Sequence, residues 1–116
     1  MSNKLKLLIP ITALIITILL SASCYEPTKI IVVNDLENRN IEFIFVSSST
    51  EDEWGTNALP NWQVLLPGEK HEITVLADTY DIQVQDSRTD IYTIWDIEIT
   101  DTDFTWNVTS DFMDEY

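Results

Sequence analysis

Carboxylates are the most abundant reactive groups in this 116-residue chain, which has 20 Asp and Glu residues, one His and one Cys. Two carboxylates at a suitable separation can hydrolyse a glycosidic bond. The spacings Asp101-x-Asp103 and Asp86-x-x-x-Asp90 could instead supply oxygen ligands to calcium. Neither fits the EF-hand loop, which needs further ligands and a Gly, so we expect both pairs to cap turns.

The single histidine, His71, precedes Glu72, but Val75 stands where a zinc protease motif has its second His. One His cannot build a multi-His metal site or a nucleophile–base–acid triad. We therefore expect His71 at a strand edge and predict no catalytic residue, metal or cofactor. A small carboxylate-dependent enzyme acting on glycans, or a weak calcium-binding module, is the alternative to a non-enzymatic module.

The single cysteine follows a segment with the three parts of an export signal. Lys4 and Lys6 make a positive start, residues 7–20 are apolar, and residues 21–23 are small. As a helix the apolar part would extend ~21 Å, which is less than the ~30 Å of bilayer hydrocarbon. We therefore predict a signal peptide over residues 1–23, with an uncleaved anchor helix as the alternative.

Residues 20–24, Leu-Ser-Ala-Ser-Cys, resemble the lipobox of bacterial lipoproteins, with Ser21 where Leu is commonest. The resemblance implies that Cys24 is lipidated and becomes the first residue of the mature protein. Each buried methylene contributes ~0.8 kcal/mol, so two or three acyl chains such as palmitate anchor stably. The implied location is the cell envelope, where the lipid holds the protein at the periplasmic face of a membrane or at the cell surface.

The net charge of the chain is −14, and every acidic residue lies at Glu26 or beyond. Such a surface repels phosphate backbones and has no basic stripe, which excludes nucleic acid as a partner. It also opposes adsorption to anionic lipid, so membrane attachment depends on the lipid anchor. The length excludes a two-domain enzyme, and 45% hydrophobic residues exclude wholesale disorder.

Beyond a tether of residues 24–28, short β-branched and aromatic runs alternate with turn residues. This pattern is typical of an antiparallel β-sandwich, here over residues 29–110, with an acidic, solvated tail over residues 111–116. A slip in the alternation at Ile94-Trp95 predicts a β-bulge. We expect about seven strands: Lys29 to Asn34, Asn40 to Ser48, Trp62 to Leu66, Glu72 to Ala77, Tyr80 to Asp86, Ile91 to Thr100 and Phe104 to Thr109.

The connections are short except for the segment from Ser47 to Asn61. Leu66-Pro67-Gly68-Glu69 has Pro and Gly where a type II turn needs them and should join two antiparallel strands. The order of Phe45-Val46-Ser47-Ser48, Trp54-Gly55, Leu66-Pro67-Gly68 and Tyr80-Asp81 resembles that in small exported β-sandwich domains of unassigned function. This resemblance implies the fold and no activity.

The long segment is the candidate binding loop, through Trp54, Gly55, Asn57 and Leu59. If Trp54 and a neighbour such as Trp62 are exposed, they offer a stacking surface to a glycan or a hot spot to a protein partner. Alternatively, Trp54 and Leu59 fold back as a plug over an open edge or end of the sandwich. The other tryptophans occupy predicted strands, and we expect them in the core: Trp62, Trp95 and Trp106.

Overall fold

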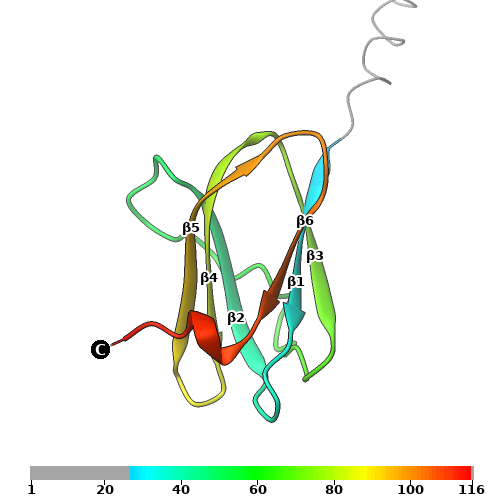
Figure 1. Cartoon of the computed structure of the whole chain (residues 1–116), viewed down its shortest axis with the longest axis vertical. Coiled ribbons are helices and arrows are strands. Elements are labelled where there is room, and N and C mark those ends of the chain that lie inside the picture. The colour runs from blue at the N-terminus through cyan, green and yellow to red at the C-terminus, as the bar shows by residue number, and fades with distance from the viewer. Residues whose placement is uncertain (1–26, 116) are drawn as a thin grey trace, which may run out of the picture.

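The computed structural model describes residues 27–115, so the predicted signal peptide and the lipidation residue Cys24 lie outside the described residues. The described chain forms two three-stranded sheets, ordered β3-β1-β6 and β2-β4-β5, which face each other (Figure 1). The all-β prediction is thereby confirmed. The elements are β1 (Thr28–Asn34), β2 (Ile41–Ser48), β3 (Lys70–Val75), β4 (Asp78–Asp86), β5 (Ile91–Ile99), β6 (Phe104–Val108) and the short 3-10 helix η2 (Ser110–Phe112).

Residues 27–115 form six strands, so the prediction of about seven in this part of the chain is corrected. The run from Trp62 to Leu66 forms no strand, and only Leu65 makes an isolated bridge, to Ile41. Trp62 has a φ of 61°, a left-handed conformation that interrupts extended backbone at the start of the predicted strand. The Pro-Gly turn is confirmed, with Gly68 at φ 87° and a 2.9 Å hydrogen bond from Glu69 N to Leu66 O, but it leads into β3 from a loop.

One pairing is parallel, which corrects the prediction of an antiparallel sandwich. β1 pairs with β3 in the antiparallel sense and with β6 in the parallel sense. Four strands separate β1 from β6 along the chain, so no tight turn dictates their relative direction. The β4–β5 connection is the hairpin of this fold, whereas the other links between described strands cross from one sheet to the other.

Alternating side chains from both sheets fill the interior. Ile30 and Val32 of β1 and Trp106 and Val108 of β6 face the β2-β4-β5 sheet, in keeping with the period of two in an extended chain. The residues buried in this single core are Ile30, Val32, Leu36, Ile41, Ile44, Leu59, Leu65, Ile82, Val84, Tyr92, Ile99, Trp106 and Val108. Within residues 27–115, no helix has the length and apolarity needed to cross a membrane.

The predicted bulge is present in β5. Tyr80 pairs with Ile97 and Ile82 with Ile94, so β5 carries one residue more than β4 between these two pairs. Asp96 takes a φ of 57°, and its amide donates to Oδ1 of Asp81 at 2.9 Å. The bulge leaves Trp95 60% exposed, which corrects its assignment to the core.

The start of the predicted acidic tail belongs to the fold. Met113 forms a bridge with Tyr92, the amide of Asp114 donates to Ile91 O at 2.7 Å, and Thr93 Oγ1 donates to the Asp114 carboxylate at 2.8 Å. Phe112 packs edge-on against Trp106. These residues extend the edge of β5, so the prediction of a solvated tail from Asp111 onward is corrected for this part.

Candidate functional site

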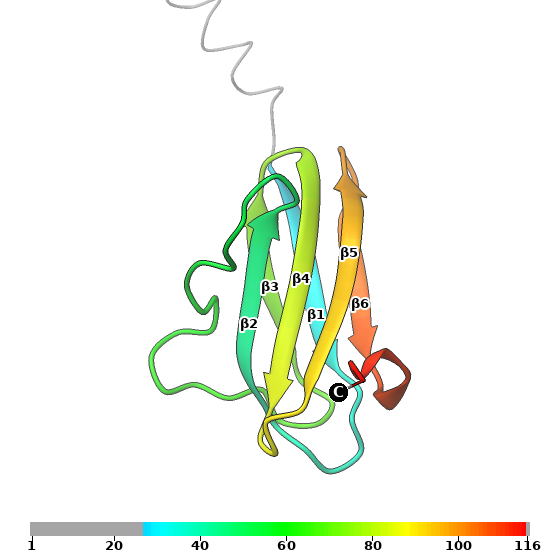
Figure 2. The same cartoon turned by 90° about the vertical axis from the view of Figure 1, so that its left-hand side faces the viewer.

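The long loop between β2 and β3, residues 49–69, lies against the β2-β4-β5 sheet and its edge. Figure 2 looks onto the outer face of this sheet, where the loop crosses the upper part of β2 and then runs down beside it. Ser49 Oγ donates to Oδ1 of Asp81 on β4 at 2.8 Å, which fixes the start of the loop over the sheet. The loop therefore covers part of the sheet and leaves the rest open.

Asn57 holds the middle of the loop to the edge strand β2. Its Oδ1 accepts hydrogen bonds from Ile44 N at 2.9 Å and from Leu59 N at 3.1 Å. Ala58 N donates to Ile44 O at 2.7 Å, and His71 Nε2 on β3 donates to Ala58 O at 3.2 Å. The loop thus bridges the two sheets at one edge, where Leu59 is buried as the plug that the sequence suggested.

Five large aromatic side chains gather on and beside the outer surface of the β2-β4-β5 sheet. We call the surface that they form the aromatic face; its residues are Phe43, Phe45, Trp54, Trp62 and Trp95. The rings of Phe43 and Phe45 on β2 are parallel with centroids 6.1 Å apart. Trp54 is partly buried against Trp95, with centroids 5.7 Å apart. Trp62 is 98% exposed, and Phe43 is 39% exposed.

A cavity of about 460 Å³ lies between the loop and β2. Phe43 and Trp62 line it together with Asn57 and Leu59, two of the four residues of the predicted binding loop. The other two, Trp54 and Gly55, lie outside it: Trp54 stacks on Trp95, and Gly55 is exposed with a φ of 82°. The cavity is open to solvent, and aromatic, aliphatic and amide side chains line it.

Sequence reasoning missed most of the aromatic face. Trp62 was expected in the core, and it is wholly exposed because the strand predicted around it does not form. Phe43 and Phe45 point outward from β2 while Ile44 and Val46 point inward, so both faces of this strand are apolar. That departure from alternation was the available signal, since a strand with one wet face needs only one apolar row.

A second cluster lies at the end of the sandwich opposite the start of β1. Asp86, which is completely buried, accepts hydrogen bonds through Oδ2 from Arg39 Nη1 at 2.8 Å and from Tyr92 Oη at 2.6 Å. Its Oδ1 accepts from the amides of Arg88 and Asp90 at 2.8 and 3.0 Å. Asp86 therefore caps the β4–β5 turn, as the sequence suggested.

In this cluster one guanidinium, that of Arg39, pairs with two carboxylates, those of Asp86 and Asp90. Arg39 Nη1 also binds Oδ2 of Asp90 at 2.6 Å. Burial by itself raises the pKa of Asp86, but the hydrogen bonds from Tyr92 and Arg39 outweigh it, and the pKa lies below its usual value. Burial and the Asp86 carboxylate together raise the pKa of Tyr92 to about 12. With Asp86 ionised and Tyr92 neutral, the hydrogen bonds of the cluster hold the strand ends together.

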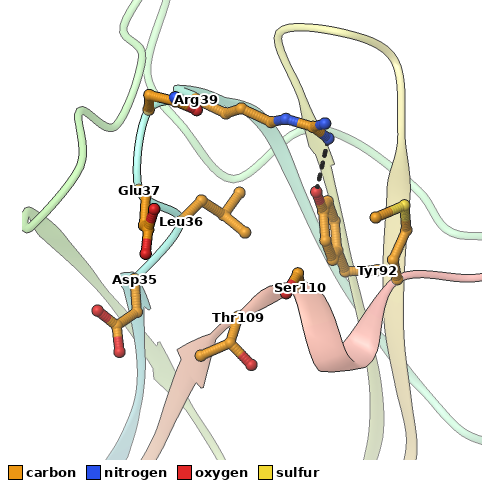
Figure 3. Close-up of a pocket in the computed structure, with 9 residues that line it drawn as sticks. Asp35, Leu36, Glu37, Arg39, Tyr92, Thr109 and Ser110 are labelled. Carbon is orange, nitrogen blue, oxygen red and sulfur yellow. Dashed lines mark hydrogen bonds between the residues drawn. The ribbon is translucent and has the colours of Figure 1, made fainter.

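Beside this cluster is a cavity of about 530 Å³ (Figure 3). Asp35, Leu36 and Glu37 line one wall, and Thr109 and Ser110 line another, with Arg39 and Tyr92 between them. Because Arg39 already binds two carboxylates, the remaining charge of the walls is negative. The cavity offers hydroxyl and carboxylate oxygens but no nucleophile next to a base.

The remaining sequence candidates serve the fold. Asp103 Oδ1 accepts the amide of Lys29 at 2.9 Å, and Asp101 accepts from Thr100 Oγ1 at 3.3 Å. His71 lies on the edge strand β3. In the described part of the chain, no three His, Cys, Asp or Glu side chains lie close enough together to hold a metal ion.

Comparison with protein-family models, with curated proteins and with solved structures finds no match for this chain.

Proposed function

We propose that this protein is a lipid-anchored lipoprotein of the bacterial cell envelope that binds a ligand through the aromatic face and catalyses no reaction. The observation that carries the binding role is the exposure of Trp62, 98% accessible on a loop held in place by Asn57. Leaving a large indole in water is unfavourable, and aromatic side chains dominate the energy of many binding surfaces. The exposed rings of Phe43 and Trp95 extend the same surface.

The anchor is proposed from the lipobox-like residues that end at Cys24. Thr28 begins β1 only four residues later, and four residues of extended chain span at most ~14 Å. The end of the sandwich that carries Asp78, Asp101 and Asp103 would then lie nearest the lipid headgroups. These carboxylates repel anionic lipid, so the sandwich would stand away from the membrane with the aromatic face along its side.

A binding module fits these contacts better than the two alternatives, a carboxylate enzyme or a calcium module. The carboxylates of Asp86 and Asp90 are engaged by Arg39, and that of Asp103 by a backbone amide. A general acid of a glycosidase needs a raised pKa, whereas the pKa of Asp86 is lowered.

The anchor is tested by growing cells with labelled palmitate. The wild-type chain should take up label, and Cys24→Ala should not; equal labelling of the two would refute lipidation of Cys24.

Binding through the aromatic face is tested in the same cells by placing a photoreactive benzoylphenylalanine at position 62 or at position 76. Leu76 is also exposed but lies in the β3–β4 turn, outside the face. Adducts should form from position 62 and not from position 76.

A further inference from the structure

We propose that the ligand of the aromatic face is an uncharged glycan chain. This inference rests on the binding role proposed above for that face and adds the chemical class of the ligand. It follows from the order in which aromatic and amide side chains alternate across the sheet, from the unused hydrogen-bonding capacity of the amides, and from the sign of the surrounding charge.

The outer surface of the sheet has three rows of side chains, one on each strand. Phe43 on β2 pairs with Gln85 on β4, and Phe45 pairs with Gln83. Across β4, Gln83 pairs with Thr93 of β5, beyond which Trp95 stands at the bulge. Paired residues in a sheet share a face. A row of amides therefore runs down the centre of the surface, between a row of Phe rings and the β5 row that carries Trp95.

The amides of Gln83 and Gln85 are half-buried and poorly used within the protein. Gln83 Nε2 reaches Thr93 Oγ1 at 3.4 Å, and Gln85 Nε2 reaches Thr89 O at 3.4 Å, both long for a hydrogen bond. No hydrogen bond to either Oε1 is present among the described residues. Each side chain thus keeps an acceptor and at least one donor for a ligand.

A sugar ring matches this pattern of groups. Its carbon-bound hydrogens form an apolar surface that packs on aromatic rings, while its hydroxyls both donate and accept hydrogen bonds at the rim. A glycan lying across the strands could place sugar rings on Phe43, Phe45 or Trp95 and its hydroxyls over Gln83 and Gln85. A protein surface would more often leave these amides unpaired, which costs binding energy.

The charge of the surroundings selects an uncharged glycan. The charged side chains next to the rings in β2 and β5 are acidic: Glu42, Asp96 and Glu98. Of the Arg and Lys residues that the structure describes, Lys29, Arg39 and Lys70 lie on β1, β3 or the β1–β2 loop, and Arg88 lies in the β4–β5 turn. The acidic side chains beside the rings would repel sulfate, phosphate or uronate groups.

The test is affinity electrophoresis and tryptophan fluorescence titration of the full chain purified in detergent micelles. The probes are three neutral oligosaccharides, cellohexaose, chitohexaose and maltohexaose, and their soluble polymers, with polygalacturonate as the charged comparison. We expect at least one neutral probe to retard the protein and to shift the emission of the exposed tryptophans, and polygalacturonate to do neither. Retardation by polygalacturonate in preference to every neutral probe would overturn the inference.

Variants locate the binding on the face. Phe43→Ala, Trp95→Ala and the double variant Gln83→Ala/Gln85→Ala should each weaken binding about tenfold or more, and Leu76→Ala should leave it unchanged. Each variant must give a far-ultraviolet circular dichroism spectrum and an unfolding midpoint close to those of wild type. Gln83→Glu, which keeps the side-chain shape and adds a charge, replaces any variant that fails to fold. It should also weaken binding.

The two proposals can fail separately. If no neutral probe binds while benzoylphenylalanine at position 62 still gives adducts to a protein in cells, the glycan inference is wrong and the binding role stands. If neither glycan nor protein adducts form at position 62, the binding role itself is wrong. Release of new reducing ends from any probe by the wild-type chain would contradict the non-enzymatic role.

Discussion

Tyr92 Oη lies 2.6 Å from Oδ2 of Asp86, with both side chains buried between the sheets. A buried carboxylate is costly unless its charge is paired and its oxygens accept hydrogen bonds. Here Arg39 shares Oδ2 with Tyr92, and two backbone amides bind Oδ1. The cluster therefore ties β4, β5 and the β1–β2 loop together at the end of the sandwich opposite the start of β1.

Replacing Tyr92 with Phe removes one donor to this carboxylate and leaves the ring in the core. A hydrogen bond to a charged group contributes ~1.5–3 kcal/mol, so Tyr92→Phe should lower the free energy of unfolding by about that amount. Urea unfolding of the full chain, followed by circular dichroism, measures the difference. An unchanged midpoint would mean that Arg39 and the amides of Arg88 and Asp90 satisfy Asp86 without the phenol.

The lowered pKa of Asp86 makes stability depend on acid pH. Because the folded-state pKa lies below the unfolded value of ~3.9, the stabilisation is complete above that value and is lost as pH falls through the folded pKa. We expect unfolding midpoints to decrease as the pH falls below about 4. Asp86→Asn should be less stable at neutral pH and should show a flatter profile over this range.

The raised pKa of Tyr92 produces the opposite dependence at alkaline pH. The folded state holds the phenol proton more tightly, with a pKa of about 12, than the unfolded chain does at ~10. This contribution is present below pH 10 and is lost as pH rises toward 12. Tyr92→Phe should remove this part of the alkaline loss, which thermal unfolding at pH 9 and pH 11 can detect.

The alternation of apolar and polar residues predicts best which side chains of a strand are buried. In β6, Trp106 and Val108 face inward between polar residues, and their burial matches the alternation. The parallel pairing of β1 with β6 has no local signal, because it joins the first and last strands of the fold. Hydrophobic periodicity predicts which face of a strand is buried and says nothing of the neighbour that it pairs with.

Tryptophan identity alone could not separate core from surface. Trp106 is 3% exposed and Trp62 is 98% exposed, although both follow an Asn or Thr residue in runs that read as strands. The difference arises at the start of the predicted strand around Trp62. Pro60 precedes it and the backbone of Trp62 is left-handed, so only Leu65 of this run pairs with β2. Of the aromatic face, the sequence singled out Trp54 as a candidate binding residue, whereas the outward placement of the other four rings depends on the tertiary fold.

We expect replacement of Trp106 and replacement of Trp62 to have very different effects on stability. Trp106→Ala should destabilise the chain by ~3–5 kcal/mol, because it leaves a large cavity beside Phe112 and Val108. Trp62→Ala should change the free energy of unfolding by no more than ~0.5 kcal/mol, since the indole makes little contact with the protein. Urea midpoints of the two variants and wild type give the comparison. A large loss for Trp62→Ala would show that its indole supports the loop and is not free for a ligand.

Asn57 determines whether the loop presents its residues in a fixed position. Its Oδ1 accepts from the amides of Ile44 and Leu59, so Asn57→Ala would leave two part-buried donors without a partner while Ala58 N still binds Ile44 O. We expect amide hydrogen exchange at positions 44 and 59 to accelerate by about tenfold or more, because opening of the loop then costs less free energy.

The matched control is Asn61→Ala, which removes an exposed amide in the same loop that makes no side-chain hydrogen bond with other described residues. Exchange at Ile44 and Leu59 should match the wild-type rates in this control. If Asn57→Ala also exchanges at the wild-type rate, the backbone pairing of Ala58 and Leu65 with β2 is sufficient to hold the loop. Acceleration in Asn57→Ala alone would instead assign the preorganisation of the aromatic face to a single amide, because Leu59 and Trp62 line the same cavity.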